Sequence, residues 1–268
     1  IFDVTPKKIL SLNDIARMPI LEKEDVRLNS EKMISDKAMK SLLYQAHTSG
    51  STGKPLRLYR NLDNIGFEHA MLMRQWEWAG LEHNDRYASI KGDIMSSAKI
   101  RNNEFWAFSP LDRKLYMSSY HIKDENLKYY LAALRKYKIV GIEGYPSSLF
   151  ALAKYMLARN EKYPVKAVLT TSETLLPYQK EVIMQAFQCK VFDYYGMAER
   201  IAAIHTCEHG HYHLVPEYSL VEFVENSSLR KGNYELVGTS LSNFCMPLIR
   251  YRVGDVIRPG NKSCSCGR

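Results

Sequence analysis

Short apolar runs alternate with helical patterns through the middle of the chain. Residues 139–142, 165–169 and 190–194 are rich in branched and aromatic side chains, and we expect each of them to form a strand. Residues 147–158 and 177–187 carry apolar positions at helical spacing, and the second segment begins with a proline, which suits the first turn of a helix. This alternation predicts an α/β fold with a doubly wound, mostly parallel sheet covered by helices.

The N-terminal third is less regular. Residues 31–45 and 63–79 are predicted helices, with a short strand over residues 56–59 between them. Residues 90–118 mix polar and aromatic side chains without a clear period, so the sequence predicts no element there.

Strand patterns follow one another after about residue 205, with no helical pattern between them. The chain is therefore expected to divide into an α/β core, residues 1–204, and a smaller β-rich, barrel-like subdomain, residues 205–268. The strands predicted in the second part span residues 212–215, 219–224, 234–237 and 256–258.

Composition narrows the class of protein. The chain is 46% apolar and 25% charged, which suits a globular domain with a sizeable core, and no apolar run approaches the roughly 18 residues of a membrane span. The net charge of +8 comes from scattered basic residues, which favours a solvated surface over a nucleic-acid or membrane partner. Five cysteines, an odd number, imply no secreted disulfide scaffold, so we expect a cytoplasmic protein.

The most distinctive segment is residues 47–55, His-Thr-Ser-Gly-Ser-Thr-Gly-Lys-Pro. Glycines let backbone N–H groups approach an anion, and hydroxyls and a lysine add donors, so the segment suits the phosphates of ATP. A Walker A loop needs four residues before its Gly-Lys-Ser/Thr, whereas only two separate Gly50 from Gly53, and a proline follows Lys54. The chain is therefore not a P-loop NTPase, and a surface turn is the alternative interpretation.

Three motifs in a fixed order resemble those of the adenylate-forming enzymes, which include acyl-CoA synthetases, peptide-synthetase adenylation domains and luciferases. Residues 48–55 resemble their phosphate loop, and residues 194–199, Tyr-Tyr-Gly-Met-Ala-Glu, their aromatic-Gly-x-x-Glu segment. Residues 246–255 are similar to their Arg-Tyr-Arg-Thr-Gly-Asp segment, with Val253 in place of the threonine. The residues of the last two motifs, together with Cys-Ser-Cys-Gly-Arg at 264–268, are most similar to those of the phenylacetate-CoA ligase branch. That branch includes CapK-like capsule-biosynthesis members.

The resemblance spans about residues 40–268 and implies a reaction. A carboxylate attacks the α-phosphorus of ATP, pyrophosphate leaves, and the acyl-adenylate passes its acyl group to coenzyme A. The implied cofactors are ATP, Mg²⁺ and coenzyme A, and the partner is a small carboxylic acid. The oligomeric state stays open, a dimer included.

The resemblance also assigns residues. Glu199 and Lys54 are the expected catalytic residues, with Glu199 as the Mg²⁺ carboxylate, and Asp255 is expected to bind the ribose hydroxyls. The alternatives are a surface glutamate that starts a helix and an aspartate in a turn. The residues expected to contact the phosphates and the adenine are Thr48, Ser49, Gly50, Ser51, Thr52, Gly53, Lys54, Tyr194, Tyr195, Gly196 and Met197.

Two further segments follow predicted strands, where ligands collect in doubly wound sheets. Residues 171–175 are similar to the family's adenine-side loop, which would make Ser172, Glu173 and Thr174 cofactor-binding, unless Ser172 or Thr174 caps the next helix. Residues 144–148 resemble a segment that lines the acyl pocket, for which capping by a serine is an equal explanation. The expected pocket residues are Tyr145, Pro146, Tyr195 and Gly196.

A set of metal-binding residue types lies apart from these motifs. Cys207, His213, Cys264 and Cys266 would make a tetrahedral Cys₃His zinc site, and some relatives of phenylacetate-CoA ligase bind zinc with a similar set. The family's Cys-x-x-Gly-x-x-His pattern favours His213 over His211. We expect a structural Zn²⁺ that holds the β-rich part together, and unrelated thiols and surface histidines are the alternative.

Other functions remain open at this stage. The family's C-terminal lid carries a lysine that contacts the α-phosphate and follows the Cys-x-Cys-Gly-Arg region, where this chain ends. We therefore expect nucleotide binding with poor turnover. A non-catalytic relative of the fold, an enzyme with a non-CoA acceptor in polysaccharide or natural-product synthesis, and a zinc-containing nucleic-acid-binding protein are the rival hypotheses.

Overall fold

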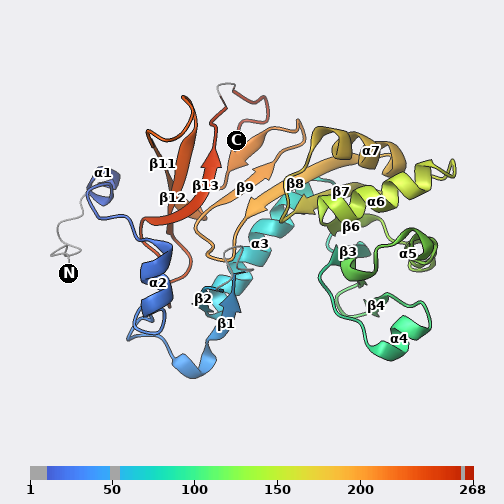
Figure 1. Cartoon of the computed structure of the whole chain (residues 1–268), viewed down its shortest axis with the longest axis horizontal. Helices are drawn as coiled ribbons and strands as arrows, with labels where there is room; N and C mark the ends of the chain where they lie inside the picture. Colours follow the sequence, from blue (N-terminus) through green and yellow to red (C-terminus); the bar gives the residue numbers. More distant parts are fainter. Residues whose placement is uncertain (1–10, 49–54, 261–262) are drawn as a thin grey trace. The chain divides into compact units, whose positions relative to one another are not determined.

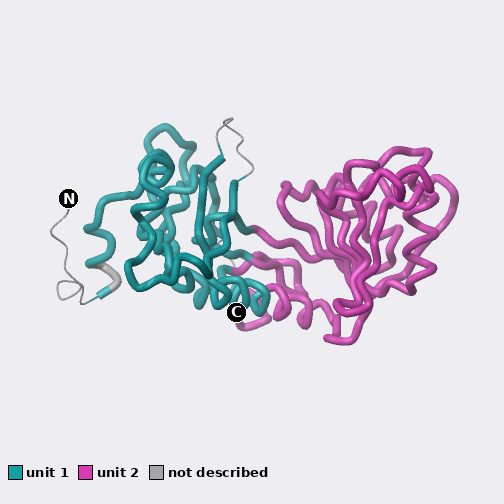
Figure 2. The backbone as a smooth tube through the Cα atoms, turned by 90° about the horizontal axis from the view of Figure 1, so that it is seen from below, with its two compact units in different colours: residues 1–71, 196–204, 214–263 teal, residues 72–195, 205–213, 264–268 magenta. Residues whose placement is uncertain are grey.

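The computed structural model describes residues 11–48, 55–260 and 263–268 (Figure 1). The chain forms two compact units, each built from three separate stretches of the sequence (Figure 2). Unit 1 contains residues 1–71, 196–204 and 214–263, and unit 2 contains residues 72–195, 205–213 and 264–268. The units are thus not the consecutive segments 1–204 and 205–268 suggested by the sequence, because most of the β-rich region groups with the N-terminal residues.

Unit 2 is built on an eight-stranded sheet with the order β10-β9-β8-β7-β6-β3-β5-β4. The neighbours from β8 to β5 are parallel, and β4 is antiparallel to β5, so the predicted mostly parallel α/β fold is confirmed. The strands are β3 (Tyr87–Lys91), β4 (Trp106–Ser109), β5 (Lys114–Ser118), β6 (Gly141–Gly144), β7 (Ala167–Thr171), β8 (Lys190–Gly196), β9 (Ala203–Thr206) and β10 (Tyr212–Leu214).

Both faces of this sheet are covered, as alternate positions of β7 show. Val168 packs into the large core beneath the helices, whereas Ala167 and Leu169 pack against Trp76 near the end of the helix α3 (Leu62–Trp78). Successive strand residues point to opposite faces, so a nearly continuous apolar strand is what a doubly wound sheet requires. The helices that supply the large core are α5 (Asp124–Lys136), α6 (Pro146–Leu157) and α7 (Pro177–Phe187) (Figure 1).

Unit 1 contains two antiparallel sheets. A hairpin joins β1 (Tyr44–His47) to β2 (Arg57–Arg60), and a three-stranded sheet has the order β11-β12-β13. The latter is an open sheet within the described residues, where the sequence suggested a barrel-like subdomain. Its strands are β11 (Ser219–Val224), β12 (Tyr234–Ser240) and β13 (Tyr251–Ile257), and the unit's short helices are α1 (Leu12–Ile15), α2 (Lys23–Asn29) and the 3₁₀ helix Lys40–Leu42.

The helix predicted over residues 31–45 is wrong. Its apolar side chains are not buried on one face, since Met39 and Leu42 are exposed, and the backbone N–H of Ser35 donates to the carbonyl of Cys245 instead of a helical partner. Residues 90–118 contain α4 (Ser97–Arg101), β4 and β5, which are too short to give a period. No helix in the described part of the chain has the length and apolar character needed to cross a bilayer.

Candidate active site and metal-binding cluster

The segments expected to bind nucleotide and acid in unit 2 follow the carboxyl ends of neighbouring parallel strands. In the parallel register Gly144 of β6 pairs with Thr170 of β7, and Thr171 of β7 pairs with Tyr194 of β8. The carboxyl ends of these three strands are therefore adjacent, and the loops that follow them start side by side. Open α/β sheets bind their ligands at the carboxyl ends of their strands.

Ser172 begins the loop after β7 in a strained conformation. Its φ is +68°, in the left-handed region that non-glycine residues rarely occupy, and such residues concentrate at ligand sites. The next helix, α7, starts after Leu176, whose backbone N–H donates to the side-chain oxygen of Gln179. Neither Ser172 nor Thr174 caps this helix, so the capping interpretation of both residues is wrong.

Glu173 connects two of the loops. Its carboxylate accepts from the backbone N–H and from the hydroxyl of Ser147, each at 3.0 Å. Tyr145 is the N-cap residue of α6 and Pro146 opens the helix, so Ser147 is not the cap that the sequence left open. Glu173 therefore links the loop after β7 to the segment after β6.

The two tyrosines of β8 point to opposite faces of the sheet, as neighbouring strand residues do. The ring of Tyr194 packs edge-on against the buried imidazole of His205, with ring centroids 5.0 Å apart. Burial, with a smaller contribution from the Arg74 guanidinium, lowers the pKa of His205 to about 4, so this ring is neutral at pH 7. Tyr194 thus packs on the sheet, and Tyr195 directly precedes Gly196, the last residue of β8.

In unit 1, Thr48 closes the base of the predicted phosphate loop. Its hydroxyl accepts from the backbone N–H of Leu56 at 3.0 Å, and its own N–H donates to the carbonyl of Leu56 at 3.2 Å. These bonds extend the hairpin pairing of His47 with Arg57 by one step. Ser49, Gly50, Ser51, Thr52, Gly53 and Lys54 lie outside the described residues.

Glu199 is the central carboxylate of unit 1. It lies in a turn after Gly196 and Met197, and its side chain is 6% exposed, so it is neither on the surface nor the start of a helix. The hydroxyl of Tyr251 donates to its Oε1 at 3.0 Å, and the ammonium of Lys23 lies 3.9 Å from the same oxygen. Burial and the carboxylate of Glu199 raise the pKa of Tyr251, so its hydroxyl remains a donor.

Neighbours fix the backbone of this turn. The guanidinium of Arg200 donates to the backbone carbonyl and to the side-chain oxygen of Asn64, both at 2.8 Å, and Arg60 donates to the carbonyl of Ala198. Arg200 itself has a left-handed φ of 55°. Glu199 is therefore a pre-positioned, buried carboxylate, and its partners Tyr251 and Lys23 were not foreseen, because they are distant in the sequence.

Asp255 lies in a bulge of β13. Arg252 pairs with Val237 and Val256 pairs with Glu235, so three residues of β13 oppose a single residue of β12. Gly254 has a φ of +91°, which only glycine adopts readily, and this conformation permits the bulge. Asp255 is exposed at this bulge, and bulges commonly redirect side chains at ligand sites.

The predicted metal ligands come together in unit 2. The ligand atoms of Cys207, His213, Cys264 and Cys266 all lie within 4.8 Å of one another, which fits a tetrahedral Cys₃His site for Zn²⁺. The cluster selects His213 over His211, whose backbone carbonyl accepts from the N–H of Cys207. Burial acts to raise the pKa of Cys207, but hydrogen bonds from the backbones of His209 and His211 and from neighbouring ligands lower it overall, which favours a thiolate.

The location of this cluster differs from the expectation. It joins the C-terminal residues to β10 and to the turn after β9, at one side of the large sheet, and not to the three-stranded sheet. Arg268 strengthens the same attachment, since its guanidinium donates to Glu208 at 2.6 Å and lies 4.0 Å from the ring centroid of Trp78.

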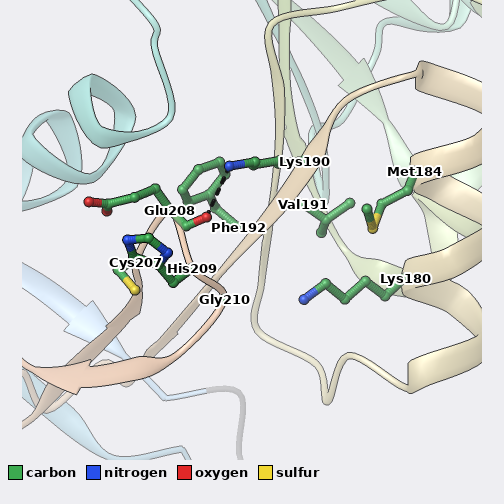
Figure 3. A pocket seen from close by; sticks show the side chains of 9 residues that line it. All are labelled: Lys180, Met184, Lys190, Val191, Phe192, Cys207, Glu208, His209 and Gly210. Carbon is green, nitrogen blue, oxygen red and sulfur yellow. Dashed lines mark hydrogen bonds between the residues drawn. The ribbon is translucent and has the colours of Figure 1, made fainter. Parts of the chain in front are cut away.

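A pocket of about 190 Å³ adjoins the cluster (Figure 3). Within it the ammonium of Lys190 donates to the backbone carbonyl of Glu208 at 3.1 Å, which ties the turn after Cys207 to β8. The pocket is lined by Lys180, Met184, Lys190, Val191, Phe192, Cys207, Glu208, His209 and Gly210.

The chain is 30% identical over 263 residues to the protein CapK of Staphylococcus aureus, which covers 97% of this chain and 57% of that protein. It is 23% identical over 274 residues to indoleacetate–lysine synthetase of Pseudomonas savastanoi, covering 94% of this chain and 64% of that enzyme. The chain thus spans less than two thirds of each of these relatives, and no family model matches it.

Solved structures show the same fold. A 2-hydroxyisobutyryl-CoA ligase in complex with 2-HIB-AMP and CoA superposes with a TM-score of 0.72 at 19% identity, over 99% of this chain and 65% of that one. A long-chain-fatty-acid-CoA ligase from Archaeoglobus fulgidus gives a TM-score of 0.54 at 15% identity, over 79% of this chain and 48% of that one.

Proposed function

Because the chain belongs to the CapK-like branch of the adenylate-forming superfamily, we propose that it contributes the nucleotide- and acid-binding part of an ATP-dependent ligase. The reaction joins a carboxylic acid to AMP and releases pyrophosphate. The observation that carries the proposal is the buried, hydrogen-bonded carboxylate of Glu199, held in a turn directly after the aromatic-Gly segment.

Each described residue receives a role from its position. Glu199 would hold Mg²⁺ through its carboxylate, and the hydrogen bond from Tyr251 and the ion pair with Lys23 orient that carboxylate. When bound, Mg²⁺ offsets negative charge on the phosphates and draws electron density from the α-phosphorus. Asp255 accepts from the two vicinal hydroxyls of the ribose, since a carboxylate has room for both bonds.

The loops at the carboxyl ends of β6, β7 and β8 bind the adenine and the acid. Ser172 and Thr174 border the adenine with Tyr195, and Tyr145 and Pro146 border the acid. Glu173 holds the two loops together through Ser147, so adenine and acid are bound in fixed relative positions. Positioning of this kind is the main contribution that a protein can make to an in-line displacement at phosphorus. Donors for the β- and γ-phosphates would come from the loop that ends with Lys54, which lies outside the described residues.

The acyl acceptor is a separate question. Coenzyme A is proposed because the 2-hydroxyisobutyryl-CoA ligase with a similar fold was solved in complex with both 2-HIB-AMP and CoA. An amine is the second candidate, since one relative is an indoleacetate–lysine synthetase. A non-catalytic nucleotide-binding protein is the third, which Val253 in place of the family's threonine favours. We propose a cytoplasmic location and a structural Zn²⁺ on the Cys₃His cluster.

Titration calorimetry of Mg-ATP, followed by pyrophosphate exchange with a panel of carboxylic acids, tests the proposal. Glu199→Gln should remove the magnesium dependence of binding, and Asp255→Ala should weaken binding at least about tenfold. Glu225→Gln, an exposed glutamate in the same unit, serves as the control and should bind as the parent does. Binding that Glu199→Gln leaves unchanged contradicts the proposed site, and binding without exchange for any acid supports the non-catalytic alternative.

A further inference from the structure

Lys23 lies beside Glu199 because the N-terminal segment is attached to the strand that carries Tyr251. Leu21 forms a parallel bridge with Tyr251 of β13, with backbone hydrogen bonds of 2.9 Å and 3.0 Å on either side of it. The helix α2 begins two residues later, at Lys23. The same strand therefore fixes the hydroxyl of Tyr251 and the origin of the Lys23 side chain next to one carboxylate.

A lysine at the first position of α2 is unfavourable for the helix itself. The positive end of the helix dipole lies there, where acidic side chains are preferred, and the next two residues are Glu24 and Asp25. The ammonium of Lys23 lies 3.9 Å from Oε1 of Glu199, and its side chain is 34% exposed. The carboxylate thus holds this ammonium loosely, and the ammonium has room to contact a second anion.

The two oxygens of Glu199 have different surroundings. The hydroxyl of Tyr251 and the ammonium of Lys23 both approach Oε1. Among the described residues, no hydrogen bond or ion pair reaches Oε2. Because a carboxylate oxygen without such a partner keeps its lone pairs, Oε2 is the atom that suits a hard metal ion.

Positive charge exceeds negative charge around this carboxylate. Burial and the Arg200 guanidinium lower the pKa of Arg60, while the carboxylates of Glu68 and Glu199 act against them, which places all four groups close together. The Nε of Arg200 lies 3.6 Å from Oε2 of Glu68. Within the described part of the chain, the three cations Lys23, Arg60 and Arg200 therefore face two carboxylates.

The other charges near Tyr251 cancel each other. Glu22 and Arg27 act on its pKa in opposite directions. Each also has its own ion pair, Glu22 with Arg252 at 3.5 Å and Arg27 with Glu24. The surplus of positive charge around Glu199 thus remains. It repels a bare divalent cation and attracts the complex of that cation with ATP, which is negatively charged overall.

We propose that Lys23 makes this site bind Mg²⁺ only together with the phosphates of a nucleotide, which the Lys23 ammonium then contacts. A lysine binds phosphate as a mobile point charge, and its flexible stem lets it turn from Oε1 of Glu199 to a phosphate oxygen. Without nucleotide, the ammonium stays beside the carboxylate and disfavours a free metal ion. The inference rests on the proposed function, since it requires Glu199 to be the carboxylate that holds Mg²⁺.

Calorimetry with the intact protein and three titrants tests this role: MgCl₂ alone, ATP with a chelator, and Mg-ATP. The parent should bind Mg-ATP, and should bind MgCl₂ alone at least about tenfold more weakly. Lys23→Met removes the charge at similar length. It should weaken Mg-ATP binding about tenfold, through loss of a charged contact, and strengthen binding of MgCl₂ alone several-fold. Lys23→Gln, a second neutral variant, should change both affinities in the same directions.

Two further variants serve as controls. Lys23→Arg keeps the positive charge and should bind all three titrants nearly as the parent does. Lys231→Met removes an exposed lysine of the same unit and should leave every affinity unchanged. Melting temperatures without ligand show that the variants are folded.

Unchanged Mg-ATP affinity in both neutral variants, or no gain in their affinity for MgCl₂ alone, would overturn this inference and leave the proposed function standing. Binding of MgCl₂ alone to the parent as tightly as Mg-ATP would have the same consequence. Failure of the parent to bind Mg-ATP would instead overturn the proposed function and this inference with it.

Discussion

Glu173 accepts two hydrogen bonds from Ser147, one from the backbone N–H and one from the hydroxyl, each 3.0 Å long. Ser147 lies in the first turn of α6, whose backbone N–H groups have no partner within the helix. A carboxylate at this position therefore satisfies an N–H group and interacts favourably with the helix dipole. The same contact fixes the loop after β7 to the loop after β6.

The first prediction concerns this contact. Glu173→Ala should lower the free energy of unfolding by about 1 kcal/mol, because it removes the partner of an N–H group at a helix start. It should also weaken Mg-ATP binding several-fold through movement of the Ser172 loop. Urea unfolding and calorimetry measure the two effects. Glu181→Ala, an exposed position on α7, is the control, and equal stability of Glu173→Ala and this control would contradict the prediction.

The sequence predicted elements well where a local signal was present. The helix over residues 177–187 begins at a proline and keeps its period, and the strand over 219–224 lies between turns, so both have the predicted bounds. The helix predicted over 31–45 failed because its segment is held by a tertiary hydrogen bond to Cys245. A local sequence pattern carries no information about a contact between residues so far apart in the chain.

The candidate site shows the same limit. Resemblance to family motifs singled out Glu199, Ser172 and the Cys₃His ligands, and the structure brings the four metal-binding side chains together. The donor to Glu199 is Tyr251, 52 residues away along the chain, and neither residue type nor spacing links the two. The role of a serine near the start of a helix also depends on residues distant in the sequence. The hydroxyl of Ser147, for example, donates to Glu173 in the loop after β7.

Tyr251→Phe provides the second prediction. The change removes only the hydroxyl that donates to Glu199, and Tyr251 is fully buried, so no water replaces the lost bond. Loss of an outer partner of a metal-binding carboxylate should weaken magnesium-dependent ATP binding about tenfold. Calorimetry at several Mg²⁺ concentrations measures this effect. Tyr234→Phe on β12 is the matched control, and an unchanged magnesium dependence in Tyr251→Phe would show that Glu199 needs no such orientation.

The third prediction concerns the Cys₃His cluster. The purified protein should contain about one Zn²⁺ per chain, and Cys266→Ser should lose it, because three ligands rarely retain a structural zinc. Chelation should lower the melting temperature, since the cluster attaches the C-terminal residues to β10 and to the turn after β9. Cys189→Ala is the control: burial raises the pKa of this thiol to about 12, and it lies outside the cluster. Full zinc content in Cys266→Ser would exclude the assigned ligand set.

The fourth prediction concerns Glu143, which separates Lys91 from Lys114. Glu143→Gln removes the carboxylate that forms ion pairs with both partly buried ammonium groups, which should lower the free energy of unfolding at pH 7 by about 2 kcal/mol. Burial acts to raise the pKa of Glu143, but the two lysines outweigh it and hold the pKa below its ordinary 4.5. The stabilising contribution is therefore complete above that ordinary value, and it is lost as the pH falls through the lowered pKa of the folded state.

The difference in stability between parent and Glu143→Gln should accordingly be constant from about pH 7 to pH 5 and shrink below about pH 4. Urea unfolding across this range measures the difference, with Glu104→Gln, an exposed glutamate of the same unit, as the control that should match the parent throughout. A difference that widens as the pH falls would mean that burial, not the lysines, dominates the ionisation of Glu143.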